Sequence, residues 1–409
     1  MAQIQVINKS NYKEHHLVTL PAEALLPLAE SSIRVQTTLF SLTTNNFTYV
    51  RFGDLVKWWD FHPLPPTTPA PYNDPEKYGR ISCWGIGHVI ESTTALVPEG
   101  TKIYGYIPIG TLPVTKRIEA SDSPNYIMET TEHRAHLSEL YNRYFIYRDN
   151  PESSSNDFAW DAAMKVLFET SYLINRFALA WDLEGHPPIS PNGLGAWSVD
   201  DADLKDTILL VFAPSSKTAA AFAQQCRVLR PRNCQPHRLV GVGSDASKSL
   251  TEGFGWYDEV AVYSDDPIAL VGEASIGSKS KVVIIDFGSR GIASASWANK
   301  LHGRVESIRC LLVGTSPTNS QGMRETIVAF PDKGATLCSA IALRSGAIQV
   351  IGPTTYFNDL DSAWDVFKKG GAIPGVTLKI GDGMNSFMKG WDDLASGKIL
   401  SSTTLLFEV

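Results

Sequence analysis

The fold is decided by the stretch Thr207–Pro214, TILLVFAP. This apolar run has the length of one strand, and a segment with helical spacing, Ser216–Leu229, follows it directly. Unbroken apolar runs are typical of strands that are covered on both faces of a parallel sheet. The same alternation continues downstream. The further predicted strands are His237–Gly243, Glu259–Tyr263, Lys281–Phe287 and Ile308–Gly314, and the helices are Ser247–Gly253 and Gly291–Leu301. This order predicts an α/β domain with a doubly wound parallel sheet of the Rossmann type over residues 156–370.

The residues before this domain are predicted to be β-rich. Ser32–Thr44 and Ile103–Ile109 are β-branched or aromatic runs bounded by glycine and proline. Six prolines in residues 61–78 exclude regular structure there. The polar stretch Asn150–Asn156 is predicted to link this region to a long helix, Phe158–Leu179, because apolar residues recur there at helical spacing.

The end of the chain carries further predicted elements. Ala347–Gly352 (AIQVIG) has the pattern of a strand, Leu360–Lys369 that of a helix, and the last forty residues predict a helix and a final strand. We expect this final strand to return to the β-rich region. Residues 1–155 and 371–409 are therefore predicted to form one domain.

Composition excludes several classes of function. The chain has 409 residues, a hydrophobic content of 43% and a formal net charge of −7 with no long Lys/Arg run, which disfavours nucleic acid as a partner. Neither a secretory signal nor an apolar run of membrane-spanning length is recognised, so we expect a cytoplasmic protein with no membrane partner. The five cysteines have no CxxC spacing and fit free thiols in a reducing compartment.

The turn after the first sheet strand, Ala213–Thr218, is the best candidate ligand site. A strand-to-helix turn directs backbone N–H groups and the positive end of the helix dipole to one point, which suits a phosphate. Ser216 and Thr218 add hydroxyl donors and Lys217 adds a charge. A serine that merely caps the helix is an equally weighted alternative. The glycines of a GxxxxGK[ST] loop are absent, which disfavours a nucleoside triphosphatase.

The second strand ends in Gly243–Lys248. Ser244, Ser247 and Lys248 favour the 2′-phosphate of NADP, whereas Asp245 at the same tip favours a ribose hydroxyl. A helix cap followed by a solvated lysine is the alternative here.

The sequence motifs give little support for a metal site or for a serine hydrolase. His133 and His136 are predicted to be a solvated pair rather than metal ligands, because no HExxH or paired CxxC motif accompanies them. No GxSxG motif offers a serine nucleophile. Trp58, Trp59 and Trp84 are predicted to lie in the core or in a pocket wall.

The order of these elements resembles the medium-chain dehydrogenase/reductase superfamily, in particular its zinc-free quinone and enoyl reductases and its DUF2855 subfamily. The segments that carry the resemblance are Ser41–Gly53, Gly87–Tyr106, Phe212–Gln224, Leu239–Lys248, Ser345–Gly352 and Trp391–Val409. The resemblance implies a GroES-like catalytic domain together with a Rossmann domain that binds NADP. The implied cofactor-binding residues are Ser216, Lys217 and Thr218 at the pyrophosphate and Ser244, Ser247 and Lys248 at the 2′-phosphate. It further implies that Asn46 and Tyr49 line the nicotinamide and substrate cleft, with Tyr49 as a proton or hydrogen-bond donor.

Two features depart from the superfamily pattern. Side chains at Ser216, Lys217 and Ala219 stand where glycines usually let the backbone approach the pyrophosphate. Trp84 and Gly85 stand where zinc-dependent members carry His and Glu, and no cysteine precedes Asn46 in this segment, so no catalytic zinc is expected.

These features predict a zinc-independent, NADPH-dependent reductase that acts on an activated C=C or carbonyl group of a hydrophobic small molecule. Two alternatives stay open: a non-redox isomerase, cyclase, lyase or hydrolase with the same fold, and a non-catalytic small-molecule-binding protein. A homodimer is one option for the subunit number. Structural roles, as a turn residue and a core aromatic, are the alternatives for Asn46 and Tyr49.

Overall fold

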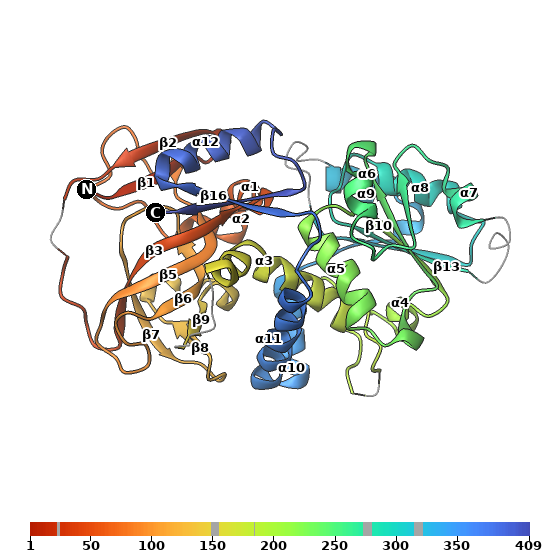
Figure 1. Cartoon of the computed structure of the whole chain (residues 1–409), viewed down its shortest axis with the longest axis horizontal. Coiled ribbons are helices and arrows are strands. Elements are labelled where there is room, and N and C mark those ends of the chain that lie inside the picture. Colours follow the sequence, from red (N-terminus) through yellow and green to blue (C-terminus); the bar gives the residue numbers. More distant parts are fainter. Residues whose placement is uncertain (23–24, 149–154, 184, 273–279, 315–321) are drawn as a thin grey trace. The chain divides into compact units, whose positions relative to one another are not determined.

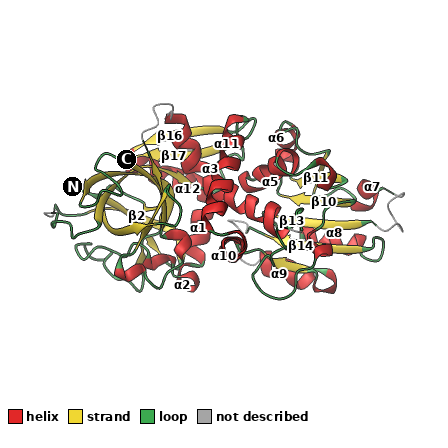
Figure 2. Cartoon of the chain, turned by 90° about the horizontal axis from the view of Figure 1, so that it is seen from below, coloured by secondary structure: helices red, strands yellow, loops and turns green. Residues whose placement is uncertain are grey.

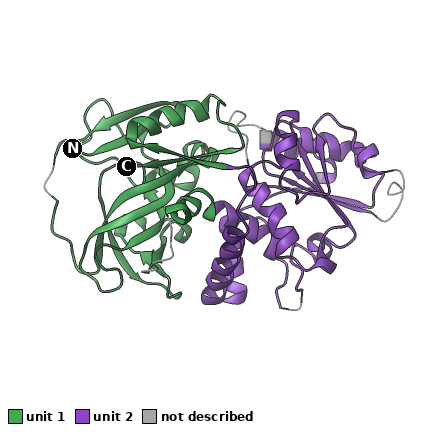
Figure 3. Ribbon diagram, viewed as in Figure 1, with its two compact units in different colours: residues 1–165, 377–409 green, residues 166–376 purple. Residues whose placement is uncertain are grey.

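The structure is a computed structural model that describes residues 1–22, 25–148, 155–183, 185–272, 280–314 and 322–409 (Figure 1). The chain divides into two compact units (Figure 3): unit 1 has residues 1–165 and 377–409, and unit 2 has residues 166–376. Both boundaries lie downstream of the predicted ones, and the first falls inside α3 (Ser155–Leu173). Most of the predicted linker Asn150–Asn156 lies outside the described residues.

Unit 2 is built on a sheet of six parallel strands in the order β12-β11-β10-β13-β14-β15. The strands are β10 (Thr207–Phe212), β11 (Arg238–Gly243), β12 (Glu259–Val262), β13 (Lys281–Asp286), β14 (Ser307–Leu312) and β15 (Ala335–Leu337). The strand order reverses between β10 and β13, which makes this the topological switch point. All six residues of β10 are buried, as a central strand covered on both faces requires. The predicted doubly wound sheet is confirmed.

The helices that follow the strands cover the two faces of the sheet (Figure 1). They are α5 (Lys217–Val228), α6 (Asp245–Glu252), α7 (Pro267–Val271), α8 (Ala293–Leu301) and α9 (Gly322–Ala329). Trp297 of α8 packs edge-on against Phe212 of β10, with 5.4 Å between ring centroids, and its Nε1 donates to the Tyr263 carbonyl at 3.1 Å. Such contacts place the core of unit 2 between the sheet and its helices.

The prediction of a strand at Ala347–Gly352 is wrong. These residues form the end of α10 (Ala340–Ile351), whose Ser339 cap accepts from the Ala342 N–H at 3.2 Å. Gly352, with a φ of 78°, ends this helix, and α11 (Pro353–Lys369) follows it directly. A short apolar run fits a strand or a buried helical turn equally well, and here the capped start upstream decides in favour of the helix.

Unit 1 contains an eight-stranded sheet in the order β16-β17-β3-β5-β6-β9-β8-β7, in which β3 also pairs with β7. The strands are β3 (Ser32–Leu42), β5 (Ser82–Ser92), β6 (Lys102–Pro108), β7 (Val114–Ala120), β8 (Tyr126–Glu129), β9 (Arg143–Tyr147), β16 (Thr377–Asp382) and β17 (Thr403–Glu408). The second pairing of β3 closes six of these strands into the ring seen in Figure 2. Closure leaves no exposed sheet edge within the ring, as in the predicted GroES-like barrel.

The remaining elements of unit 1 border this barrel sheet. β17 pairs with β3 and is preceded by α12 (Gly383–Ala395), so the end of the chain joins the first strands. A smaller sheet pairs β1 (Gln3–Asn8) with β2 (Asn11–Thr19) and β4 (Tyr78–Gly79). The proline-rich residues 61–77 form no helix or strand, as predicted. Across the described residues, each helix is too short or too polar to cross a membrane.

Candidate functional site

The turn after β10 holds an unusual backbone conformation. Ala213 has a φ of 55°, in the left-handed region that costs a residue with a side chain about 1–2 kcal/mol. Its N–H donates to the Val242 carbonyl at 3.0 Å, and its own carbonyl accepts from the Ser216 N–H at 3.0 Å. These bonds turn the chain sharply from the strand into α5. Ala213 opens the predicted turn, but its left-handed conformation has no signal in the sequence, because such a φ favours glycine.

The predicted phosphate-binding residues lie at the start of α5. Ser216 is the N-cap, and its Oγ accepts from the Ala219 N–H at 3.3 Å, so this side chain has the capping contact that was weighed as its alternative role. Lys217 is half-buried, and desolvation lowers the pKa of its ammonium group to about 8. Thr218 is also half-buried, and its carbonyl accepts from Ser171 Oγ at 2.7 Å.

The turn after β11 carries the other predicted cofactor residues. Ser244 is the N-cap of α6, and its Oγ lies 3.0 Å from Ser247 Oγ. Ser247 Oγ also contacts the Ser244 carbonyl at 3.1 Å. The Lys248 side chain is 40% exposed, and its Nζ lies 4.0 Å from Glu252 Oε1, a weak surface ion pair. Lys248 therefore has the freedom to contact another anion.

The sheet brings these two turns together. β10 and β11 are neighbouring parallel strands, with Phe212 opposite Val242, so both turns leave the same carboxyl edge. Pro214 fills the space beside β11, where a Cβ on Gly241 or Gly243 would lie 3.0 or 3.2 Å from it. The two sets of predicted residues thus belong to one edge, next to the switch point.

A buried carboxylate orders the turn after β13 on the other side of β10. Asp286 Oδ1 accepts from the N–H groups of Gly288 and Ser289 at 2.9 and 2.8 Å, and its Oδ2 accepts from Ser294 Oγ at 2.6 Å. These hydrogen-bond partners belong to its own turn and to α8. We assign it a structural role, which the sequence reading had missed because an aspartate that ends a strand has no distinctive pattern.

The remaining two predicted residues lie in unit 1, on α1 (Thr44–Arg51). Asn46 is buried. Its Oδ1 accepts from the Thr43 N–H at 2.9 Å, and its Nδ2 lies 3.5 Å from the Ser82 carbonyl. Asn46 thereby fixes the start of α1 and ties it to β5.

Tyr49 lies one turn further along α1, within a group of aromatic rings. Its hydroxyl accepts from Asn45 Nδ2 at 2.7 Å and from Trp84 Nε1 at 2.8 Å. The rings of Trp58 and Tyr106 pack against it, with centroids 4.7 and 5.3 Å away. Burial raises the pKa of Tyr49 well above its usual value, so its hydroxyl keeps its proton at neutral pH.

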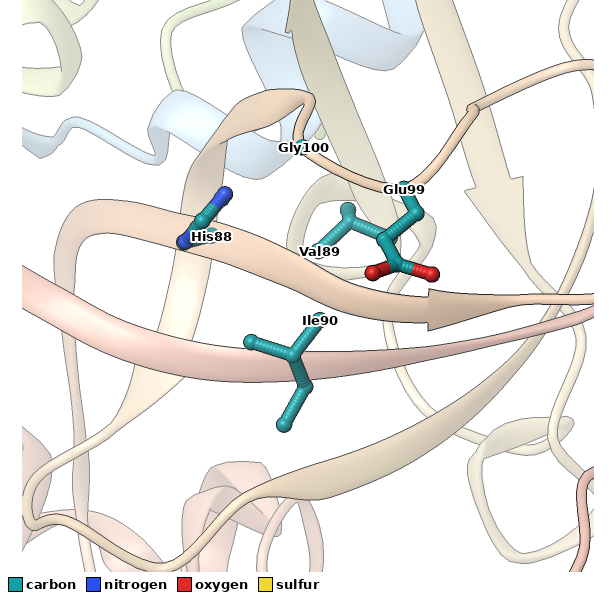
Figure 4. Close-up of a pocket in the computed structure, with 5 residues that line it drawn as sticks. All are labelled: His88, Val89, Ile90, Glu99 and Gly100. Carbon is teal, nitrogen blue, oxygen red and sulfur yellow. The ribbon is translucent and has the colours of Figure 1, made fainter.

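The predicted histidine pair and a surface pocket belong neither to the two turns of unit 2 nor to the aromatic group around Tyr49. In the described part of the chain, no three His, Cys, Asp or Glu side chains are placed to hold a metal ion, and His133 and His136 are both exposed. A pocket in unit 1 is lined by His88, Val89, Ile90, Glu99 and Gly100 (Figure 4). It contains none of the predicted site residues.

Comparisons with known proteins identify the family of this chain. A family model described as "protein of unknown function (DUF2855)" matches residues 40–400. The chain belongs to the DUF2855 family. No curated protein matches this DUF2855 chain.

Solved structures share the fold of this DUF2855 protein along its whole length. They cover 100% of this chain and 99% of their own: Etr1p in complex with NADP and crotonyl-CoA (TM-score 0.57, 12% identity), CurA from Vibrio vulnificus with NADPH (0.55, 11%), and the CurF ER cyclopropanase of the curacin A biosynthetic pathway (0.55, 11%). The DUF2855 chain thus has the fold of the medium-chain dehydrogenases/reductases, with a Rossmann-type sheet and a GroES-like barrel.

Close packing at the switch point makes the DUF2855 protein sensitive to substitution of Gly288. A Cβ on Gly288 would lie 2.7 Å from the Ala213 Cβ, so one of the two turns must shift. We expect Gly288→Ala to lower the free energy of unfolding by about 1–3 kcal/mol, measured by urea denaturation. Gly370→Ala is the control, because its Cβ would meet its nearest atom at 3.4 Å and its φ of −74° suits alanine. Equal stability of the two variants would contradict the proposed close approach.

Proposed function

We propose that this protein is a zinc-independent, NADPH-dependent reductase of an activated C=C or carbonyl group in a hydrophobic small molecule. The observation that carries the proposal is the pair of neighbouring strand-to-helix turns at the carboxyl edge of a doubly wound sheet, beside its switch point. Ligands of such sheets bind at this edge. Etr1p and CurA, which share the fold at low identity, were solved with NADP and NADPH respectively.

The start of α5 fits a pyrophosphate despite its missing glycines. An α-helix leaves N–H groups of its first turn without intrahelical acceptors, and its dipole favours an anion there. Ser216 Oγ accepts from the Ala219 N–H, and we propose that its own hydroxyl proton is donated to an oxygen of the pyrophosphate. We propose that the Lys217 ammonium and the Thr218 hydroxyl supply the remaining contacts to the pyrophosphate.

A change of pH tests the role of Lys217. Because the pKa of its ammonium is lowered to about 8, the group is charged at pH 7 and loses its charge as the pH rises above 8. We expect NADPH to bind progressively more weakly between pH 7 and 9.5, as followed by tryptophan fluorescence. Lys217→Met is expected to bind about tenfold more weakly at pH 7 and to lose this pH dependence. An unchanged pH dependence in that variant would remove Lys217 from the site.

The turn after β11 fits the 2′-phosphate. We propose that Ser244 and Ser247 hydroxyls contact it and that Lys248 leaves its weak pair with Glu252 to neutralise it. Lys248→Ala is then expected to weaken NADPH binding about tenfold and to leave NADH binding unchanged. Lys300→Ala, at the exposed end of α8, is the matched control and should affect neither nucleotide. Equal losses for both nucleotides in Lys248→Ala would contradict the assignment.

The GroES-like unit is proposed to supply the proton chemistry. When bound, NADPH provides a hydride. The Tyr49 hydroxyl accepts hydrogen bonds from Asn45 and Trp84, so both of its lone pairs are engaged and its own proton is the group it can offer. We propose that it donates to the oxygen of the substrate, where negative charge develops during reduction. Asn46 would act as a positioning residue, because it anchors the helix that carries Tyr49.

The finer parts of the proposal rest on two features. The aromatic rings that surround Tyr49 favour an apolar substrate. Zinc independence is proposed because Trp84 and Gly85 stand where the resemblance implies the His and Glu of zinc-dependent members.

Nucleotide binding is the deciding experiment. Titration with NADPH and NADH, followed by tryptophan fluorescence and by thermal shift, is expected to give saturable micromolar binding of NADPH. Turnover is then measured as NADPH oxidation with a panel of alkenals and quinones. If neither nucleotide binds, the reductase proposal fails. Binding without oxidation of any acceptor would favour the alternative of non-redox chemistry with a structural cofactor.

A further inference from the structure

A cluster of buried positive charges lies in unit 1 and borders the aromatic group around Tyr49, because the ring of Tyr106 lies 5.3 Å from that of Tyr49. Arg80, Lys116 and Arg134 are 3%, 0% and 0% exposed. The carboxylate bonded to this cluster is that of Glu129, which is 5% exposed. Buried charges are tolerated when counter-charges and hydrogen bonds compensate them, and one carboxylate cannot compensate three cations.

Glu129 already contacts four donors. Its Oε2 accepts from Lys116 Nζ at 2.9 Å and from the Tyr144 hydroxyl at 2.8 Å, and it also pairs with Arg134 Nη1. Its Oε1 accepts from Thr131 Oγ1 at 3.0 Å. This carboxylate therefore satisfies Lys116 and one nitrogen of Arg134, whereas Nε and Nη2 of Arg80 make no bond to it.

Most of the atoms left over near these cations are hydrogen-bond donors, and the one acceptor among them is Asn142 Oδ1, whose amide nitrogen donates to the Arg134 carbonyl. Nε and Nη2 of Arg80, and Nε and Nη2 of Arg134, are buried without a hydrogen-bond partner among the described residues. The Tyr106 hydroxyl is also buried; the Ser82 N–H is placed to donate to its oxygen, so its own proton is the donor left over. A buried donor without an acceptor is costly, so such a group of donors indicates that an acceptor occupies the same place.

Contacts around His62 connect these donors. His62 Nδ1 lies 2.5 Å from Ser82 Oγ, and Arg80 precedes Ser82 by two positions in the segment from β4 to β5. The Arg134 guanidinium lies 4.9 Å from the centre of the Phe61 ring, and that ring lies 5.4 Å from the ring of Tyr106. Burial, and then the charges of Arg134, Lys116 and Arg80, lower the pKa of His62 well below its usual value. His62 is therefore neutral, and all three cations act on one location.

We propose that Arg80, Arg134 and Tyr106 bind a small inorganic monoanion, with chloride as the physiological ion. Water would supply acceptor atoms but would leave the excess positive charge buried, whereas an anion supplies both the acceptor and the counter-charge. The site joins the β4–β5 junction to η2 (Glu132–Arg134) and to the start of the proline-rich loop. It is independent of the proposed cofactor site.

Equilibrium unfolding tests this proposal. The protein is unfolded with urea in sodium gluconate and in increasing sodium chloride at constant ionic strength. A ligand that binds only the folded state lowers the unfolding equilibrium constant by the factor 1 + [L]/Kd, so chloride at about ten times its Kd is expected to lower it about tenfold, in a saturable manner. Arg80→Met should abolish the chloride dependence. The absence of any difference between gluconate and chloride in the wild-type protein would overturn the proposal.

Arg230→Met is the matched control. Arg230 is equally buried, at 2% exposed, but its Nε donates to Asn175 Oδ1 at 3.3 Å and its Nη1 to the Cys234 carbonyl at 3.1 Å. This variant should be less stable at every chloride concentration and keep the full chloride dependence. The same loss of chloride dependence in both variants would contradict a specific site.

A second measurement needs no variant. Crystals of the wild-type protein grown in sodium bromide are expected to show an anomalous scattering peak within hydrogen-bonding distance of Arg80 Nε and Nη2. Water molecules alone at that position, or no density there, would overturn the proposal even if salt changes the stability.

Discussion

Replacing Glu129 by glutamine is expected to lower the free energy of unfolding by about 3–5 kcal/mol. The substitution keeps the size of the side chain but leaves Lys116 and Arg134, both 0% exposed, without their counter-charge. Burial, and then the charge of Arg134, already hold the pKa of Lys116 well below its usual value. Urea denaturation at neutral pH measures the loss.

An ion pair of the same barrel that is open to solvent on its acidic side provides the control. The Arg34 side chain is 6% exposed, but its partner Glu91 is 42% exposed, so water reaches the lost contact, and Arg34 also donates to the Leu26 carbonyl. Glu91→Gln should therefore cost about 2 kcal/mol less than Glu129→Gln. Similar losses for the two variants would mean that Glu129 does not compensate buried charge.

Tyr49→Phe is expected to lower kcat of the proposed reductase about 100-fold while NADPH affinity stays unchanged. The substitution removes the one proton that the hydroxyl can donate and keeps the ring against Trp58 and Tyr106. The measurement is steady-state NADPH oxidation with the alkenal or quinone that the wild-type protein reduces fastest. A kcat within twofold of wild type would exclude Tyr49 as the donor.

Loss of structure needs a separate control, because Tyr49→Phe also removes the acceptor of Trp84 Nε1 and Asn45 Nδ2. Trp84→Phe removes one of these donors and keeps the Tyr49 hydroxyl. It is expected to retain most of the activity, whereas a purely structural role for Tyr49 would make the two variants equally impaired. Thermal unfolding of both variants separates a loss of stability from a loss of chemistry.

Local sequence patterns predicted those strands of unit 2 whose residues are nearly all buried. The apolar runs of β10, β11 and β13 are strands because all of their environment is core, so hydrophobicity alone identifies them. The same reasoning failed at Ala347–Gly352, where an apolar run of strand length closes a capped helix. It also passed over β16, which is largely exposed and pairs only because β17 lies beside it.

For the candidate site, the sequence by itself determined which turns could hold a phosphate, because a strand, a cap residue and a helix follow one another within a few positions. Only the tertiary structure decided that the turns at Ser216 and Ser244 share one sheet edge, that Ala213 adopts a left-handed conformation, and that the Asn46 side chain is committed to its own helix. The cluster of Arg80, Lys116, Glu129 and Arg134 had no signal in the sequence at all. Its members lie on separate segments that come together through the closed barrel, and the cost of burying charge depends on neighbours in space rather than along the chain.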